Sequence, residues 1–566
     1  MALRLRRWLA CLMLSGLGVS GTGWLAMCQA AEPDTAPKPA WDVNHPPGES
    51  LVVPIDTRTG TWMSVDVSPD GQRILFDLLG DLYELPIAGG EARALTHSMA
   101  WEMQARYSPD GRHIAFVSDA GGADNLWVMN ADGSGARALT REDLRTLNNP
   151  VWHPGGEYIA ARKHYTGTRS LGSGEIWLYH VAGGKGVALN EKPNWQKDLG
   201  EPAFAPDGRH LYFSQDVTPG TRFEYNRNSR GEIFAIQRLD TADGSIEAFV
   251  TGPGGAVRPV PSPDGQRLAF VRRVSNRSTL FVKDLADGRE RPIWSGLDRD
   301  LQEAWSVQGV YPSFAWLPGS RELVLWAQGR LWRVDSVRRD AVEIPFHVKD
   351  TREIRAALRV PVEGAPDRFD LKQLRGVNVA PQGDRLVYSA LGHLYLRPLP
   401  DGVPRRLAPL ADRLAPRADR LTPQADRFEF FPRFSRDGRA LVFVTWNDQA
   451  QGRVVKLDLA TGRETVLTPA PGLYLQPQFS PDGRSVVYVK GRGSYLLSPW
   501  NGLDTGIYRV TADGKGLPER LARSGEAPQF GARNDEVFVT RSTTSSIACT
   551  WRSSLSLVGP QANSIW

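Results

Sequence analysis

A short turn motif recurs along the whole chain and constrains its fold more than any other feature. The first copy lies in the string VDVSPDGQRI, which begins at Val65. Six copies have Asp-Gly as their last two residues and begin at Ser68, Ser108, Ala205, Ser262, Ser435 and Ser480, and four weaker copies begin at His153, Leu317, Ala380 and Phe530. Successive copies are about 40 to 63 residues apart. A period of this size is typical of solenoids, propellers and other repeat arrays.

Each copy predicts a hairpin followed by two more short strands. Within the motif, proline presets φ at the second position of a type I turn, aspartate bonds to nearby backbone, and glycine accepts the positive φ that closes the bend. Val65 and Val67 precede the first turn, and Ile74 and Phe76 follow it. This alternation is the pattern of half-buried strands. A third strand is expected at residues 82–85 and a fourth after the next glycine turn.

Four short antiparallel strands in each repeat, with no amphipathic helical stretch between them, indicate the blades of a β-propeller. Sandwich domains with coincidental turns are the alternative. Because propellers typically hold about four to eight blades, ten copies predict two rings. We therefore expect an all-β chain of tandem β-propellers built from four-stranded antiparallel blades, with about six blades in the first ring and about four in the second.

The widest gap between turn copies, from Leu317 to Ala380, predicts the boundary between the rings. We expect a first propeller at residues 40–340, an inter-propeller crossover at 341–372 and a second, incomplete propeller at 373–541.

Two further segments differ from the repeats. A seven-residue unit repeats in tandem from Leu407 to Arg427 with one proline in each copy. Proline breaks helices, so this segment predicts an expanded loop instead of a coiled coil. The atypical tail at 542–566 is rich in Ser and Thr.

Residues 1–31 have the composition of a secretory signal peptide. Three arginines precede an apolar run from Trp8 to Val19, and small residues follow near Ala30, as in cleavable signals. A membrane anchor is the alternative, but the run is short for a membrane span. Met27 stands where a lipoprotein signal needs a small residue, so we do not expect lipoprotein anchoring. The sequence predicts cleavage near Ala30 and a periplasmic protein.

Charge and cysteine content exclude several classes of partner and bond. The formal net charge is +5 and falls to about +2 once the three signal arginines are removed, so neither nucleic acid nor an anionic membrane surface is indicated as a partner. Of the three cysteines, Cys11 and Cys28 lie in the signal and leave Cys549 alone. The mature chain is therefore not expected to form an intramolecular disulfide. The oligomeric state is not predicted.

Motifs for catalysis or cofactor binding are missing from the sequence. The nine histidines form no HxH or HExxH pattern, which zinc hydrolases use. No G-x-S-x-G nucleophile elbow and no lysine-bearing phosphate loop is present. We therefore predict no catalytic residues, no metal ligands and no cofactor for this chain.

The blades, taken in order, resemble a known family. The segments that carry the resemblance are Asp77–Tyr83, the turn Gly89–Ala92, Ser118–Asp119, Gly122–Trp127 and Glu175–Tyr179. Together they resemble the amino-terminal region of exported bacterial amidohydrolases with a TolB-like propeller, over roughly residues 40–540. The turn motif alone is similar to those of TolB, the tricorn protease and the propellers of prolyl-oligopeptidase-type peptidases.

The resemblance implies a metal-dependent barrel domain that follows the propeller and holds catalytic histidines and an aspartate. This sequence offers no HxH motif onto which those ligands could be carried, and the tail after Arg541 does not resemble the family. A frameshift or premature end near that residue is a hypothesis that accounts for both observations.

Two functions from different classes follow. The chain is either a non-catalytic scaffold whose channel binds or gates a protein or peptide, or a fragment of a metal-dependent amidohydrolase (a C–N hydrolase) or of a propeller-gated peptidase whose catalytic domain is absent. Ligand contacts are expected from loops that enter the innermost strand of each blade, because these loops surround the channel mouth. Ordinary solvated loop residues are the alternative. The candidate residues are Trp101, Glu102, Gln104, Asn148, Asn149, Asp198 and Glu201.

Overall fold

A computed structural model of the chain describes residues 42–540, apart from residues 167–171, 224–230, 275–276, 305, 357–359, 361, 365, 408–426, 448–449 and 492–503. The described residues form strands and turns and include no helix, as the all-β prediction requires. The predicted signal peptide, most of the predicted 407–427 loop and the tail at 542–566 lie outside the described residues. Within the part that is described, no helix is long and apolar enough to cross a membrane.

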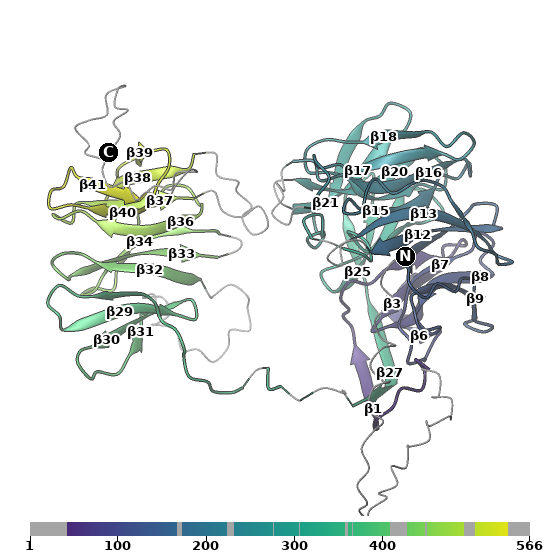
Figure 1. Ribbon diagram of the computed structural model, residues 1–566, viewed down its shortest axis with the longest axis horizontal. Coiled ribbons are helices and arrows are strands. Elements are labelled where there is room, and N and C mark those ends of the chain that lie inside the picture. Colours follow the sequence, from purple (N-terminus) through teal and green to yellow (C-terminus); the bar gives the residue numbers. More distant parts are fainter. Residues whose placement is uncertain are drawn as a thin grey trace, which may run out of the picture. The chain divides into compact units, whose positions relative to one another are not determined.

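Six four-stranded antiparallel sheets form the first propeller, and the strands of each sheet follow one another in sequence order (Figure 1). The first three blades are β2 (Val65–Val67), β3 (Arg73–Leu78), β4 (Asp81–Pro86) and β6 (Arg93–Ala94); β7 (Glu102–Tyr107), β8 (His113–Ser118), β9 (Asn125–Asn130) and β10 (Arg137–Ala138); and β11 (Thr146–Trp152), β12 (Tyr158–Thr166), β13 (Gly172–His180) and β14 (Val187–Ala188).

The next three blades complete this ring. They are β15 (Leu199–Phe204), β16 (His210–Asp216), β17 (Phe234–Asp240) and β18 (Ile246–Val250); β19 (Val257–Pro261), β20 (Arg267–Val274), β21 (Arg277–Asp284) and β22 (Glu290–Trp294); and β23 (Ala315–Trp316), β24 (Glu322–Ala327), β25 (Arg330–Asp335) and β26 (Ala341–Ile344).

The repeated turn forms the hairpin between the first two strands of each blade. In the first copy Val65 pairs with Phe76 across the hairpin. Gly71 N–H donates to Ser68 O at 2.7 Å, and Gly71 has a φ of 72°, a conformation that glycine adopts without steric cost. Ser68 Oγ also donates to Asp70 Oδ1 at 2.5 Å. These contacts form the tight turn that the residue types of the motif predict.

The ring closes between its first and sixth blades. Val65 and Phe76 of the first blade pack in one apolar cluster with Val324 and Trp326 of the sixth. Val65 N–H also donates to Ser313 O at 2.9 Å, in the chain that leads into β23. The first six copies of the repeat therefore make one closed propeller, with apolar side chains packed between neighbouring blades.

The chain segments before and after this ring pair with each other. β1 (Ser50–Thr57) is antiparallel to β27 (Phe346–Arg355), and β27 also lies parallel to the short strand β5 (Gly90–Glu91). The segment that we expected to cross between the rings, residues 341–372, thus includes the outer strand β26 of the sixth blade and the strand β27. Figure 1 shows β1 and β27 side by side.

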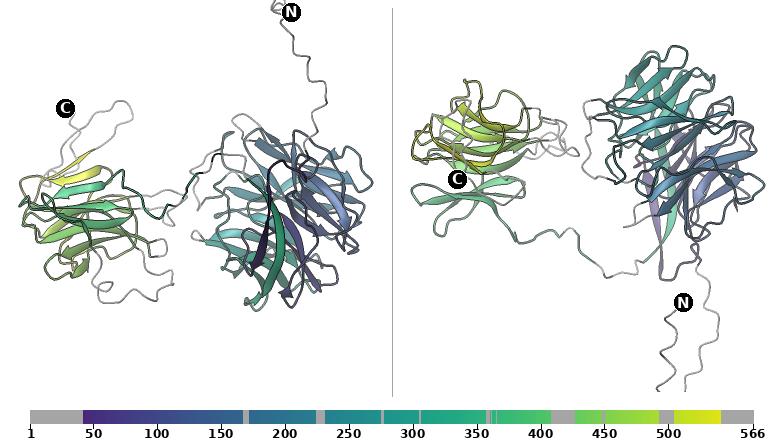
Figure 2. Two further views of the ribbon diagram at one scale, coloured as in Figure 1. Left: turned by 90° about the horizontal axis from the view of Figure 1, so that it is seen from below. Right: turned by 45° about the horizontal axis from the view of Figure 1, so that its top comes forward.

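The remaining repeats form three more four-stranded sheets and a two-stranded one within the described part of the second propeller (Figure 2). They are β28 (Arg375–Val379), β29 (Arg385–Ala390), β30 (His393–Pro398) and β31 (Arg405–Arg406); β32 (Phe428–Phe434), β33 (Ala440–Trp446), β34 (Arg453–Asp458) and β35 (Glu464–Val466); β36 (Tyr474–Phe479), β37 (Ser485–Lys490), β38 (Gly506–Thr511) and β39 (Glu519–Ala522); and β40 (Glu526–Phe530) with β41 (Val537–Thr540).

Candidate functional site

A β-bulge recurs on the innermost strands of the second to fifth blades. In each strand the register shifts around one residue with positive φ, which lies four positions before the repeated turn. These residues are Gln104, Asn149, Glu201 and Arg258, with φ between 52° and 57°. Bulges bend a strand and change the direction of a side chain, and a non-glycine residue at positive φ is uncommon. The four positions therefore have a conformation that must be stabilised by their surroundings.

Hydrogen bonds between neighbouring blades provide that stabilisation. Gln104 N–H donates to Asp77 Oδ2 at 2.7 Å, and Asn149 N–H donates to Gln104 Oε1 at 2.7 Å. Arg258 N–H donates to Glu201 Oε2 at 2.8 Å, and its Nη1 donates to Asn149 Oδ1 at 2.9 Å. We refer to Asp77, Gln104, Asn149, Glu201 and Arg258 as the axial network, because it joins the inner strands around the axis of the propeller.

The axial network includes a buried ion pair. Arg258 Nη2 lies 3.1 Å from Glu201 Oε1, and the two residues are only 4% and 2% exposed. Burial lowers the pKa of Arg258 to about 10 and raises the pKa of Asp77 to about 6, because a low-dielectric site disfavours the charged forms. Charged groups in this position need partners, and the network supplies them.

A second buried group lies beside the network on the third blade. Arg162 Nη2 donates to Asp198 Oδ1 at 2.6 Å, and its Nε donates to Leu199 O at 2.8 Å. Nη2 also lies 2.8 Å from His164 Nδ1. Burial, followed by the nearby positive charge of Arg162, lowers the pKa of His164 to about 3. The imidazole is therefore neutral at physiological pH.

The connection between β22 and β23 closes the axis on the side where loops enter the inner strands. We call its residues Ser306–Tyr311 the plug. Val307 O accepts hydrogen bonds from Asn148 Nδ2 at 2.9 Å and from Arg162 Nη1 at 3.0 Å. Two side chains of the third blade therefore hold one peptide carbonyl of the plug.

Other blades hold the rest of the plug. Gln308 O accepts a hydrogen bond from Gln104 Nε2 at 2.6 Å and a longer one from Asn149 Nδ2 at 3.4 Å. Val310 N–H donates to Glu201 Oε1 at 2.6 Å. The plug is thus bound mainly through its backbone, by polar side chains from the second, third and fourth blades and by Arg258 of the fifth.

The chain immediately before the plug is fixed by buried charges. Arg273 Nη2 donates to Asp300 Oδ1 at 2.6 Å, and its Nη1 also bonds to Glu303 Oε1. Ser278 Oγ donates to Asp300 Oδ2 at 2.6 Å. Because all these residues are buried, the fifth blade fixes the point from which the plug extends.

Five of the seven residues that the sequence suggested for ligand contact gather around the plug. Four of them bond to the plug, namely Gln104, Asn148, Asn149 and Glu201. The fifth, Asp198, pairs with Arg162, which also bonds to the plug. All five are buried, so they are not ordinary solvated loop residues.

The other two suggested residues lie apart from this group. Trp101 is 54% exposed, and its N–H donates to Asp119 Oδ1 at 2.7 Å. Glu102 is buried and accepts a hydrogen bond from Ser98 Oγ at 2.6 Å. Burial raises the pKa of Glu102, but no hydrogen bond that the described residues make links it to the plug.

Sequence reasoning did not identify Asp77, Arg162, Arg258 and Gln308. A usable signal for Arg258 was present, because the bulge residues Asn149, Glu201 and Arg258 all precede a proline at the same distance from the turn. Arg162 lies on the second strand of its blade, and Gln308 lies in the long connection between β22 and β23. The position of the turn therefore predicts neither residue as part of the site.

An open cavity of about 400 Å³ lies at the other end of the axis. We call it the funnel. The innermost strands and turns of all six blades line it, with Trp152, Trp316 and Arg106 in its wall and Arg258 also among its lining residues. Arg258 Nε donates to Tyr311 O at 2.8 Å, so this residue contacts both the funnel and the plug. The prolines of the lining are Pro69, Pro109, Pro154, Pro202, Pro259, Pro261, Pro263 and Pro318.

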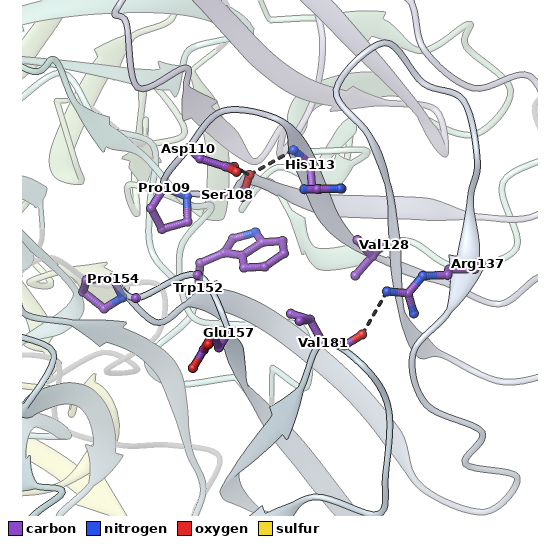
Figure 3. Close-up of a pocket in the computed structure, with 12 residues that line it drawn as sticks. Ser108, Pro109, Asp110, His113, Val128, Arg137, Trp152, Pro154, Glu157 and Val181 are labelled. Atoms are coloured by element: carbon purple, nitrogen blue, oxygen red, sulfur yellow. Dashed lines mark hydrogen bonds between the residues drawn. The ribbon is translucent and has the colours of Figure 1, made fainter.

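A groove of about 490 Å³ continues from the funnel between the second and third blades (Figure 3). Its lining shares Ser108, Pro109, Trp152 and Pro154 with the funnel. Figure 3 shows the Trp152 indole between the two blades. At the outer end, Arg137 Nη2 donates to Val181 O at 2.8 Å across the same two blades. The funnel and the groove therefore adjoin at the four residues that they share.

A search of the described part of the chain for three or more His, Cys, Asp or Glu side chains placed to hold a metal ion finds no such group.

Comparisons with known proteins agree with the propeller architecture. Residues 54–224 match the sequence profile of a family described as the TolB beta propeller domain. The chain is 32% identical to the uncharacterized peptidase YuxL of Bacillus subtilis, over 22% of this chain and 23% of that protein. It is 26% identical to tricorn protease homolog 1 of Streptomyces coelicolor, over 48% of this chain and 23% of that protein.

A shorter match has higher identity. The Tol-Pal system protein TolB of Anaeromyxobacter dehalogenans is 52% identical over 8% of this chain and 10% of that protein. Among solved structures, TolB from Acinetobacter baumannii superposes with a TM-score of 0.39 and 15% identity, over 51% of this chain and 64% of that one. The sequence matches span less than a quarter of the length of each of these relatives. The segment that matches the profile of the TolB beta propeller domain, residues 54–224, covers the first three blades and part of the fourth.

Proposed function

We propose that this chain is an exported TolB-like propeller protein that acts as a binding or gating scaffold for a protein or peptide. The observation that carries the proposal is the funnel. Its volume of about 400 Å³ is within the range of ligand-binding cavities. The funnel is open at the turn side and is lined by all six blades, so a ligand there would contact every repeat of the ring.

The chemistry of the funnel suits a polypeptide ligand. Each inner strand is an edge strand of its sheet, and an edge presents backbone N–H and C=O groups that an extended peptide can pair with. The turn prolines Pro69, Pro109, Pro263 and Pro318 add exposed apolar surface. Trp152 and Trp316 also line the funnel but are only 8% and 5% exposed. Arg106 supplies a charged group in the same wall.

The features of residues 1–31 support export as part of the proposal. The apolar run from Trp8 to Val19 and the small residues near Ala30 fit a cleaved signal. Fractionation of the cells that produce the protein tests this directly. We expect a shortened chain in the periplasmic fraction, and a full-length chain in the cytosol would contradict export.

Site-specific photocrosslinking tests the binding function. A photoreactive phenylalanine analogue at Pro154, which lines both the funnel and the groove, is compared with the same analogue at the exposed Ile246 on the outer strand β18. The second position of a type I turn accepts most residues, so the fold should be retained. We expect a covalent adduct of defined mass, between the chain and a bound protein or peptide, only when the analogue replaces Pro154. Equal adducts at both positions, or none, would contradict the proposal.

A second candidate function is that of the propeller part of a larger peptidase or amidohydrolase. The printed names of two relatives, a peptidase and a tricorn protease homolog, favour it, together with the small share of those proteins that is matched. Under this candidate the purified chain by itself hydrolyses no amide, peptide or ester. Turnover that persists through purification and disappears with a chelator would show instead that the chain contains a catalytic centre.

A further inference from the structure

We propose that the plugged end of the first propeller is itself a peptide-binding site, which the plug occupies as a built-in ligand and from which a glycine-containing turn of a partner polypeptide displaces it. The inference rests on the proposed function, because it identifies a second peptide site on the same axis and a means of gating it. It concerns the end of the channel opposite the funnel.

The bonds that hold the tip of the plug are of the kind by which a protein binds the backbone of a peptide. Side-chain N–H groups of Gln104, Asn148 and Arg162 donate to the carbonyl oxygens of Val307 and Gln308. None of these bonds uses a side chain of the plug. The plug forms a turn at this point, in which Gly309 N–H donates to Ser306 O at 3.4 Å. The same donors would therefore bind the backbone of another turn of this shape, and the sequence of that turn matters little at these two carbonyls.

The next residue of the plug limits which segments fit. A Cβ atom at Gly309 would lie 2.5 Å from Arg258 Nη2 and 3.2 Å from Glu201 Oε1. Gly309 also has a φ of +112°, which residues with a side chain rarely adopt. A competing ligand is therefore a peptide turn with glycine directly after the two bound carbonyls.

The covalent connection of the plug makes it an effective gate. The preceding chain is fixed by Asp300 and Glu303, which pair with Arg273, and the last residue of the plug, Tyr311, is buried. A ligand tethered by short connections has an effective concentration on the order of millimolar. A free peptide with micromolar affinity for the site would therefore be largely excluded from the native protein.

Gly309→Ala is the variant that separates the plug from its site. The added methyl group collides with Arg258 and is incompatible with the backbone conformation, while the donors on the second and third blades are unchanged. Gly319→Ala is the matched control, because a Cβ atom at Gly319 meets no atom within 4 Å and its φ is outside the positive range. A second variant replaces residues 306–309 by Gly-Ser. It removes the tip of the plug without introducing a steric clash.

The probe is a fluorescently labelled synthetic hexapeptide with the sequence of Ser306–Tyr311, and binding is measured by anisotropy. We expect it to bind Gly309→Ala and the shortened variant at least about tenfold more tightly than it binds the native protein or Gly319→Ala. Adding Gln104→Ala to Gly309→Ala should weaken binding about tenfold, since a donor to Gln308 O is lost. Limited proteolysis reports independently whether the plug has been released.

Two outcomes overturn the inference. The first is a folded Gly309→Ala or shortened variant whose plug is released or absent but which does not bind the hexapeptide, because the plug would then be a structural loop only. The second is native protein that binds the hexapeptide as tightly as the variants do. Either result, combined with an adduct at Pro154, leaves the proposed funnel function intact. Absence of that adduct counts against the proposed function and not against this site.

Discussion

Arg258 and Glu201 form an ion pair that is buried on the axis of the first propeller, with Arg258 Nη2 3.1 Å from Glu201 Oε1. Glu201 also accepts hydrogen bonds from the backbone N–H groups of Arg258 and Val310. One carboxylate thus connects the fourth blade, the fifth blade and the plug. The positive φ at both Glu201 and Arg258 is maintained by these contacts.

Glu201→Gln tests the importance of this pair. The substitution leaves the Arg258 charge buried without a counter-ion, and breaking a buried pair in this way costs about 3–5 kcal/mol. We expect the free energy of unfolding, from urea titrations, to fall by about that amount. Arg238→Gln is the control, because the Arg238–Glu247 pair is partly exposed and such pairs contribute less than about 1 kcal/mol. Equal losses in the two variants would contradict the role of the axial network.

The neutral His164 predicts a specific dependence of stability on pH. Its pKa is about 3 in the folded protein and about 6.5 in the unfolded chain. Between these values the unfolded chain binds more protons, so stability is lost as pH falls. Each pH unit below 6.5 should cost about 1.4 kcal/mol from this group, or about 2 kcal/mol at pH 5.

His164→Gln removes this dependence while keeping an acceptor for Arg162. We expect the difference in unfolding free energy between pH 7 and pH 5 to be smaller in the variant by about 2 kcal/mol. If the native protein and the variant lose the same stability on acidification, His164 is not buried in the neutral form.

Val65 and Val377 occupy the same position of the repeat in the first blades of the two propellers. Val65 is fully buried against the sixth blade, whereas Val377 is 49% exposed. Truncation of a buried aliphatic side chain costs about 2–4 kcal/mol, and surface substitutions usually cost less than about 0.5 kcal/mol. We expect Val65→Ala to destabilise the first propeller markedly and Val377→Ala to have almost no effect on the second.

Pulse proteolysis in urea, with separate fragments followed for each propeller, measures both effects. A comparable loss in the Val377 variant would mean that this face of β28 is covered in solution.

Much of the fold could be predicted because its determinants are local. The turn that begins at Ser68 specifies a hairpin through its own residues, and alternation at Val65 and Val67 specifies which side chains are buried. The pairing of β1 with β27 could not be predicted, because the two strands lie about 290 residues apart and neither contains the repeat. Contacts over such separations depend on ring closure, which no local pattern describes.

The site was partly predictable for the same reason. Gln104 and Asn149 were found because they are polar residues shortly before the turn-bearing hairpin of their blade. Their function in holding a backbone carbonyl could not be predicted, because the sequence of residues 306–311 has no feature that identifies a plug. Its conformation is determined by polar side chains from four blades, which are brought together only after the ring has formed.

Hydrogen exchange at the plug of the native protein, followed by mass spectrometry, is the most direct test of the claim that the chain closes its own axis. The amides of Val310 and Tyr311 donate to Glu201 Oε1 at 2.6 Å and 3.2 Å, and both residues are buried. We expect these two amides to exchange as slowly as those of the inner strands, and we expect the Gly309→Ala variant to lose this protection. Exchange of the two amides at the rate of an unprotected loop in the native protein would contradict closure of the axis by the plug.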